Sequence, residues 1–122
     1  MPIFGSPPYL RMTEKEKVEA RTHFQAWQLS QFLHGEQGAL ICTSKIVQQV
    51  PSIDAKFYGA TQVIDEARHV EAYSRLLHEK FQLAYPITPT LKSLLEDVLN
   101  ESRWDMTYLG MQVLIEGIAL AA

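Results

Sequence analysis

The residues best suited to bind a metal ion lie in the segment Asp65-Glu66-Ala67-Arg68-His69. Residues three apart on an α-helix share a face, so the carboxylate of Glu66 and the imidazole of His69 can reach one ion. Two further carboxylates, Glu36 and Glu116, stand in segments whose apolar residues recur at helical spacing. A lone carboxylate in an apolar helix face costs several kcal/mol unless it is paired. The four residues therefore predict a two-metal site inside a helix bundle, with ligands on several helices.

Carboxylate oxygen and imidazole nitrogen are ligands that suit iron and manganese. We therefore expect two iron ions, with manganese or a mixed manganese and iron pair as alternatives. For Glu66 and His69 taken alone, a surface glutamate beside a core histidine is the simpler interpretation, since Glu-x-x-His often occurs by chance. The presence of Glu36 and Glu116 in apolar surroundings favours the metal site over that interpretation.

The composition predicts one soluble domain. The 122 residues are 47% hydrophobic and 20% charged, with a net charge of −3. This acidic balance, without a cluster of lysine and arginine, argues against a nucleic-acid partner. The single cysteine, Cys42, cannot form an internal disulfide and is expected to pack as a small apolar residue in a reducing cytoplasm. We find no signal peptide, and no apolar run reaches the roughly 18 residues that a membrane span needs.

The pattern of apolar residues, caps and prolines predicts an all-α chain with short loops. Residues 1–12 are expected to form a coil arm, because they are rich in proline and glycine. Thr13 is expected to cap the first long helix, Ser52 the second, and Thr88 or Thr90 the third. Gly35 and Gly38 predict a small kink or a close helix contact near Glu36. The expected helices span residues 13–49, 53–81, 88–100 and 103–122.

The last six residues, 117–122, still have the composition of a helix interior. We expect that the chain is cut within a helix, the alternative being a natural end that docks on another subunit. A weak repeat supports the first interpretation, since Glu36 and Glu116 each begin the pattern Glu-x-x-Ala-Leu. In the first copy Glu-x-x-His follows thirty residues later. Its counterpart would begin near position 146, outside this sequence.

Three motifs carry a resemblance to a known family, and together they cover most of the chain from about Phe24 onward. They are Gly35-Glu36-Gln37-Gly38-Ala39-Leu40, Asp65-Glu66-Ala67-Arg68-His69 and Leu114-Ile115-Glu116-Gly117. The sequence resembles the di-iron carboxylate branch of the ferritin-like superfamily. This branch includes the ribonucleotide reductase small subunit, the monooxygenase hydroxylases and the acyl carrier protein desaturases.

The resemblance implies a ferritin-like helix bundle, of which residues 13–122 would be the N-terminal part and the fourth metal-bearing helix would be absent. It implies that Glu36 is a terminal ligand of the first iron and that Glu66 bridges the two irons. By the same resemblance, His69 is the nitrogen ligand and Glu116 binds the second iron. The family's second Glu-x-x-His has no counterpart in this sequence.

Other residues are expected to support these ligands. A metal-bound histidine usually donates its second N–H to a carboxylate, and the resemblance implies that Asp65 serves the histidine of the opposite half. An exposed Asp65 paired with Arg68 or Lys56 is the alternative. Gln62 and Gln112, each one turn before a ligand, are expected to hydrogen-bond the site or to fill the bundle.

Tyr73 stands one turn after His69 on the same face. In the ribonucleotide reductase small subunit a radical tyrosine follows its histidine at this interval, so the resemblance implies a catalytic, redox-active Tyr73. A packed tyrosine with a hydrogen-bonded hydroxyl is the alternative. Five residues near the ligand turns are expected to line a substrate pocket or, alternatively, the core: Leu29, Phe32, Thr43, Val63 and Val70.

The leading hypothesis for function is an O2-dependent oxidase or oxygenase of a small organic substrate, with the electron donor left open. A second enzyme hypothesis is a ferroxidase, a peroxidase or a manganese catalase on the same scaffold. A third is a helical interaction module without enzymatic activity. The remaining ligands would come from the missing C-terminal half or from a second copy of the chain in a homodimer.

Overall fold

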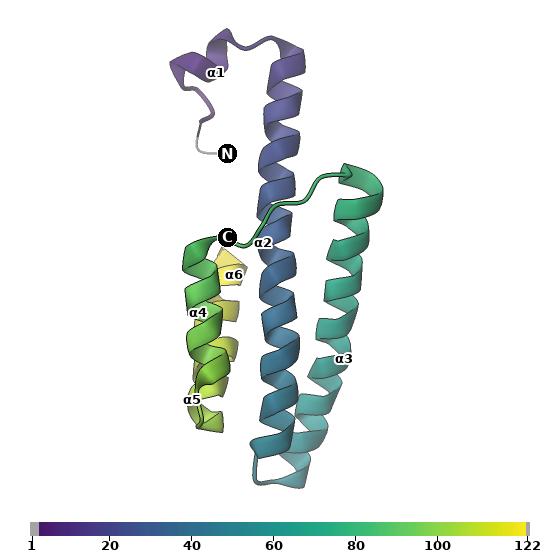
Figure 1. The fold of residues 1–122 in the computed structure, drawn as a ribbon, viewed down its shortest axis with the longest axis vertical. Coiled ribbons are helices and arrows are strands. Elements are labelled where there is room, and N and C mark those ends of the chain that lie inside the picture. Colours follow the sequence, from purple (N-terminus) through teal and green to yellow (C-terminus); the bar gives the residue numbers. More distant parts are fainter. Residues whose placement is uncertain (1–2, 122) are drawn as a thin grey trace.

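The computed structural model describes residues 3–121, and within that range the chain forms helices and loops without a strand. This confirms the all-α prediction. A long central helix, α2, has α3 on one side and the α4, α5 and α6 segments on the other (Figure 1). The helical segments are α1 (Pro7–Arg11), α2 (Glu14–Gln49), α3 (Ile53–Arg75), η1 (Leu76–Phe81), α4 (Pro89–Asn100), α5 (Trp104–Tyr108), η2 (Leu109–Ile115) and α6 (Glu116–Ala121).

The start of α2 is fixed by a capping box. The hydroxyl of Thr13 accepts a hydrogen bond from the backbone N–H of Glu16, and the Glu16 carboxylate accepts one from the N–H of Thr13. These bonds satisfy two amides that a helix end otherwise leaves without partners. Thr13 is therefore the cap that the sequence predicts, and α2 ends at Gln49, one residue before the Val50-Pro51 pair.

The second helix also begins and ends where its sequence predicts. The hydroxyl of Ser52 accepts from the N–H of Ala55 at 3.1 Å, and α3 follows. The last six residues of this helix, η1, have π-helical geometry, which the sequence pattern does not predict. The helix ends at Phe81, and the φ of 52° at the following residue, Gln82, lies in the left-handed region that turns the chain out of a helix.

The predicted coil arm is wrong in one part, because Pro7–Arg11 form the short helix α1. The hydroxyl of Ser6 accepts from the N–H of Tyr9, and prolines occupy the first positions, where their missing N–H costs no hydrogen bond. The same proline and glycine content that predicts a coil thus starts a helix when a serine precedes it.

The C-terminal part forms the second wall of the bundle. Thr88 caps α4, as one of the two predicted threonines, and the chain breaks between Asn100 and Trp104 before the last helical stretch. That stretch begins one residue after the predicted start at Arg103 and contains the π-helical segment η2 between α5 and α6. Within residues 3–121, no helix combines the length and the apolar character needed to cross a lipid bilayer.

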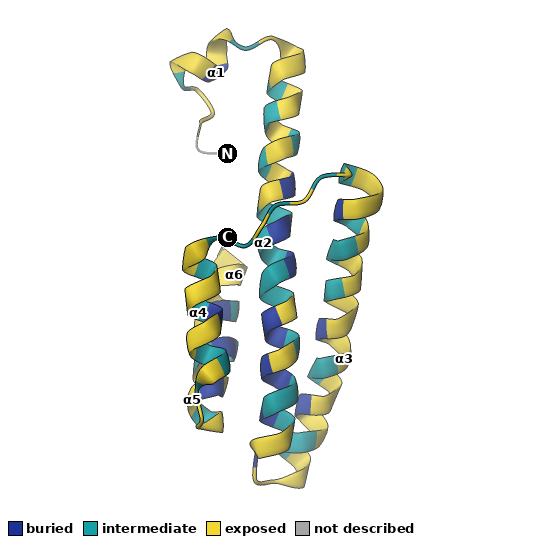
Figure 2. Cartoon of the chain, viewed as in Figure 1, coloured by how far each residue is buried: buried dark blue, intermediate teal, exposed yellow. Residues whose placement is uncertain are grey.

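The core lies on the two sides of α2 that face its neighbours, whereas the outer face of α3 is exposed (Figure 2). One cluster joins α2 to the C-terminal segments and the other joins it to α3 and η1. Cys42 is fully buried in the first cluster, as predicted, and burial raises the pKa of its thiol to about 11. The clusters contain Ala39, Cys42, Leu95, Met111 and Ile115, and Ala26, Leu33 and Leu77.

Gly38 allows α4 to approach α2 closely, which confirms the expected helix contact at this glycine. A Cβ placed on Gly38 would lie 2.6 Å from Cδ2 of the buried Leu95, whereas a Cβ on Gly35 would meet nothing within 4 Å. Gly38 therefore has no room for a side chain unless Leu95 moves, whereas Gly35 in the same helix has room for one.

We expect Gly38→Val to lower the free energy of unfolding by about 2 kcal/mol, because overpacking a closed core costs roughly 1–3 kcal/mol. Urea unfolding measures the change. Shortening the opposing side chain with Leu95→Val should recover part of the loss in the double variant. Gly35→Val is the matched control, and an equal loss there would contradict the steric explanation.

Candidate metal centre

Two antiparallel helices bring three of the four predicted ligands together. Glu36 comes from α2, and Glu66 and His69 share one face of α3. Nδ1 of His69 lies 3.1 Å from Oε2 of Glu36 and 3.5 Å from Oε2 of Glu66. One ligand atom from each residue lies within 4.8 Å of the others, a spacing compatible with binding one ion.

The three residues differ in their access to solvent. The side chain of Glu66 is 7% exposed, that of Glu36 21% and that of His69 55%. The site is therefore closed on the side of the carboxylates and open on the side of the imidazole. Gln62 supports the buried end, since its Nε2 donates to Oε1 of Glu66 at 3.1 Å. This is one of the two roles that the sequence predicts for Gln62.

Burial and mutual repulsion keep protons on this cluster. Burial, and after it a hydrogen bond with Glu66, raise the pKa of Glu36 to about 7 against the opposing effect of His69. Burial disfavours the charged imidazole of His69, but the carboxylates of Glu36 and Glu66 outweigh that effect and raise its pKa. A group of acids in such surroundings needs a cation to carry its full negative charge.

No lysine or arginine supplies that cation in the part of the chain that the structure describes. The ion pairs of Glu36 and Glu66 are with His69, and no ion pair joins either acid to a lysine or an arginine. The lysines and arginines that form ion pairs in the described residues do so with other acids. The donor set is carboxylate oxygen and imidazole nitrogen, which fits a divalent iron or manganese ion. The residues present therefore fit the predicted metal.

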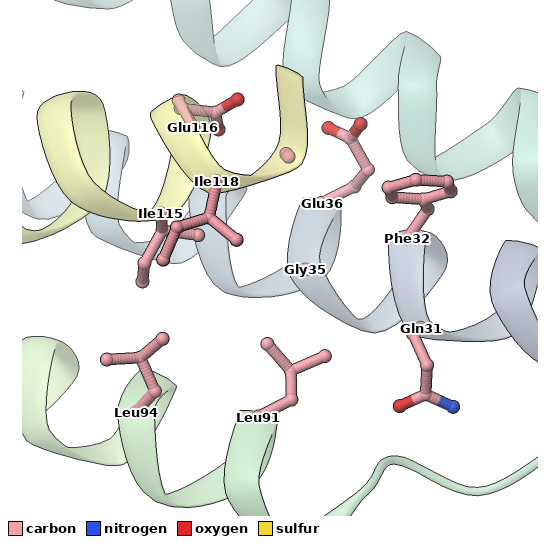
Figure 3. A pocket seen from close by; sticks show the side chains of 10 residues that line it. Gln31, Phe32, Gly35, Glu36, Leu91, Leu94, Ile115, Glu116 and Ile118 are labelled. Carbon is pink, nitrogen blue, oxygen red and sulfur yellow. The ribbon is translucent and has the colours of Figure 1, made fainter. Parts of the chain in front are cut away.

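Glu116 lies near this cluster but outside the group of three. It is the first residue of α6, directly after the π-helical η2, and its carboxylate and that of Glu36 extend toward the same space (Figure 3). Burial raises the pKa of Glu116, and the negative charge of Glu66 raises it further. The carboxylate of Glu116 thus extends toward the other acids, as the sequence predicts. That Glu116 is a metal ligand stays a prediction.

A pocket of about 180 Å³ opens beside Glu36 and Glu116. Its wall is apolar apart from these two acids and Gln31, and Leu91 and Leu94 of α4 close it opposite the carboxylates (Figure 3). The full lining is Gln31, Phe32, Gly35, Glu36, Leu91, Leu94, Ile115, Glu116, Ile118 and Ala119.

Of the five residues predicted to line a pocket, only Phe32 does so. Leu29 and Val70 pack in the core around Leu77, the alternative that the sequence left open for them. Sequence reasoning missed the other uncharged lining residues, which come from α2, α4, η2 and α6. The amphipathic pattern of α4 signals that Leu91 and Leu94 face inward.

Tyr73 stands one turn from His69, as predicted. Its ring stacks on Phe32 at a centroid distance of 6.0 Å, and burial together with the charge of Glu36 raises the pKa of its hydroxyl. The phenol therefore keeps its proton beside the cluster. Its redox activity stays a prediction.

The two remaining predicted neighbours behave differently from Gln62. Asp65 is exposed and accepts a hydrogen bond from Arg68 at 3.2 Å, so the alternative role predicted for it is the one observed. This i, i+3 pair on the outer face of α3 satisfies Asp65 locally. A role of Asp65 toward the histidine of an opposite half stays a prediction. Nε2 of Gln112 is buried without a hydrogen-bond partner, so Gln112 makes no bond to Glu116 through this atom.

Comparison with models of known protein families, with curated proteins and with solved structures finds no match for this chain.

Proposed function

We propose that this chain forms part of a ferritin-like, two-metal carboxylate centre that uses O2 to oxidise a small organic substrate. The observation that carries the proposal is the convergence of Glu36, Glu66 and His69 from two helices without a lysine or arginine partner. Two iron ions are the proposed cofactors, with manganese or a mixed pair as alternatives. When bound, such ions supply electrons and open coordination positions for the reduction of O2.

The residues of the chain have distinct proposed roles. Glu36, Glu66 and Glu116 hold the ions, and His69 supplies the nitrogen ligand. Gln62 fixes the orientation of the Glu66 carboxylate through its hydrogen bond. A second Glu-x-x-His is not in this sequence, so the proposal takes the remaining ligands from another helix, on a second copy of the chain or on a segment outside residues 1–122.

Tyr73 is the proposed redox partner of the centre. Its raised pKa keeps the hydroxyl protonated, and Glu36 lies close enough to influence that pKa. When the ions are bound and oxidised by O2, a phenol beside a carboxylate could pass one electron to them while its proton moves to the acid. The stacked ring of Phe32 holds the phenol in position.

The apolar pocket favours an organic substrate over iron or peroxide as the substrate. Phe32, Leu91 and Ile115 line this pocket, and such a lining suits an apolar molecule better than an ion. A small apolar molecule bound there would lie directly beside Glu36 and Glu116. The pocket thus supports the proposed oxygenase, and an O2-uptake experiment distinguishes it from the second enzyme hypothesis.

An O2-uptake experiment tests the proposal. The chain is loaded with Fe2+ without oxygen and then exposed to O2 with a chemical reductant and a panel of small apolar compounds. We expect uptake to stop near the amount of bound iron without a compound and to continue when one is added. Uptake proportional to all the iron supplied would instead indicate a ferroxidase.

A variant that fills the pocket tests the same proposal. Gly35 lines the pocket, and a Cβ placed on it would meet nothing within 4 Å. The side chain added by Gly35→Leu would therefore occupy the pocket. We expect it to remove the compound-dependent O2 uptake and to leave the amount of bound iron unchanged. Gly117→Leu, also at an open glycine but outside the pocket, is the control.

A further inference from the structure

The hydroxyl of Thr43 is an exception among the hydroxyls of these helices. Thr43 is 1% exposed, and its Oγ1 has no hydrogen-bond partner. The neighbouring Ser44 donates to the carbonyl of Leu40 at 2.8 Å, and the equally buried Thr107 donates to that of Arg103 at 3.1 Å. Thr43 makes no such bond to its own helix, so its hydroxyl is directed elsewhere.

A second buried polar atom without a partner belongs to Gln112. Its Nε2 is a donor enclosed between the helices, in the π-helical segment η2. Thr43 Oγ1 and Gln112 Nε2 are the two buried side-chain atoms without hydrogen bonds in the described part of the chain. Because buried polar groups in native proteins nearly always find a protein or water partner, the pair requires an explanation.

The helix register places Thr43 and Gln112 at one level of the bundle. Met111, directly before Gln112, and Ile115, three residues after it, pack in one cluster with Ala39 and Cys42 of α2. Cys42 directly precedes Thr43 in the sequence. Both residues therefore lie one to two turns from the carboxylates, on the same side of them.

The register between α2 and α3 adds a third polar residue to this level. Phe32 stacks on Tyr73, Glu36 meets His69, and Val47 lies against the position of Gly59. In this antiparallel order Thr43 stands opposite Gln62. Nε2 of Gln62 is used by Glu66, which leaves its carbonyl oxygen as an acceptor. Each of the three helical stretches that carry the acids thus contributes one uncharged polar side chain to this level. These side chains are Thr43, Gln62 and Gln112.

We propose that Thr43 and Gln112 hold a buried water molecule in this layer, with the carbonyl of Gln62 as its third partner. The water accepts hydrogen bonds from Nε2 of Gln112 and from the hydroxyl of Thr43, and it donates one to the carbonyl oxygen of Gln62. Three polar partners are the usual number for a buried water. Through Gln62 the water fixes the Glu66 carboxylate, which makes Thr43 a positioning residue for the metal centre. Only this last step rests on the proposed function.

A stability cycle on the metal-free chain tests the water site. We expect Thr43→Val to lower the melting temperature by about 4 °C, since the change removes one of the partners of the water and leaves Gln112 unpaired. In the Gln112→Leu background the same change should have an effect of less than about 1 °C. A rise in melting temperature, or an equal shift in both backgrounds, would overturn the proposal.

Nuclear magnetic resonance gives a direct second measurement. A long-lived water should show a cross-relaxation signal to the protons of residue 43 in the native chain and in Thr43→Ser, which keeps the hydroxyl. The signal should disappear in Thr43→Val. Its absence in the native chain would overturn the proposal even if a variant fails to fold.

The positioning role is tested separately by titration with Mn2+. We expect Thr43→Val to weaken Mn2+ binding about tenfold, the lower end of the effect of residues behind metal ligands, and Thr43→Ser to restore it. Thr61→Val, at an exposed hydroxyl bonded to the carbonyl of Tyr58, is the control. A water signal in a chain that binds no metal would support the water site and overturn the proposed function. Failure of the water proposal can therefore be distinguished from failure of the proposed function.

Discussion

Replacing Glu66 by alanine is expected to weaken the binding of Fe2+ and Mn2+ by more than about 100-fold. Residues that merely support metal ligands already contribute 10- to 100-fold, and Glu66 is the most buried acid of the cluster, with both oxygens facing polar partners. His69→Ala should have a similar effect because it removes the nitrogen ligand. Anaerobic titration of each ion, followed by calorimetry, measures both changes.

The matched control for this experiment is Glu71→Ala. Glu71 lies on the same helix as Glu66, but its side chain is 71% exposed and faces Arg75 at 3.9 Å. We expect its removal to leave metal binding unchanged. Equal losses for Glu66→Ala and Glu71→Ala would mean that the ions bind to surface acids, and unchanged binding in Glu66→Ala would contradict the proposed centre.

The second large effect expected is a loss of stability of the metal-free chain as the pH rises from 5 to 8. The pKa of Glu36 is raised from 4.5 to about 7 in the folded state, so the folded chain binds more protons than the unfolded chain in this interval. Stability therefore falls as the pH rises through it. The raised pKa of His69 acts in the same direction, because its stabilising charge is lost at high pH.

Glu36→Gln should remove most of this dependence. At pH 8 we expect the variant to exceed the native chain by about 3 kcal/mol in the free energy of unfolding, since one pKa unit corresponds to about 1.4 kcal/mol. Urea unfolding at pH 5 and pH 8 measures the difference. Glu19→Gln, at an exposed acid of α2, is the control, and parallel pH curves for Glu36→Gln and the native chain would contradict the explanation.

Metal should reverse the effect of pH in the native chain. An ion binds the deprotonated acids of the folded state and stabilises it by mass action, so added Mn2+ should stabilise the native chain more at pH 8 than at pH 5. The same addition should not stabilise Glu36→Gln to that extent. An acid that destabilises the metal-free chain and stabilises the metal-bound chain behaves as a residue that binds the metal.

The helix boundaries could be predicted because their causes are local. Thr13, Ser52 and Thr88 each accept a hydrogen bond from an amide three residues ahead, and prolines stop or start the neighbouring segments. The convergence of Glu66 with His69 follows from a spacing of three on one helix. Glu36 joins them because α2 and α3 are connected by a short turn and must run antiparallel.

The remaining features depend on packing between helices, which a sequence pattern does not contain. The π-helical geometry of η1 and η2 has no local signal, although Glu116 directly follows η2. Leu91 and Leu94 line the pocket because α4 lies against α2 at Gly38. Asp65 pairs with Arg68 on its own helix, and the sequence alone does not decide between this pair and its alternatives.

The half-exposed imidazole of His69 has a consequence for handling the protein. Because 55% of this side chain faces solvent while Glu66 is enclosed, an ion would enter and leave along the imidazole without separation of α2 from α3. Cation exchange would then proceed in the fully folded chain, and a chelator such as EDTA would strip the centre during purification. An ion found after isolation would then reflect the buffer, so the proposed centre should be reconstituted with a chosen metal before its metal preference is measured.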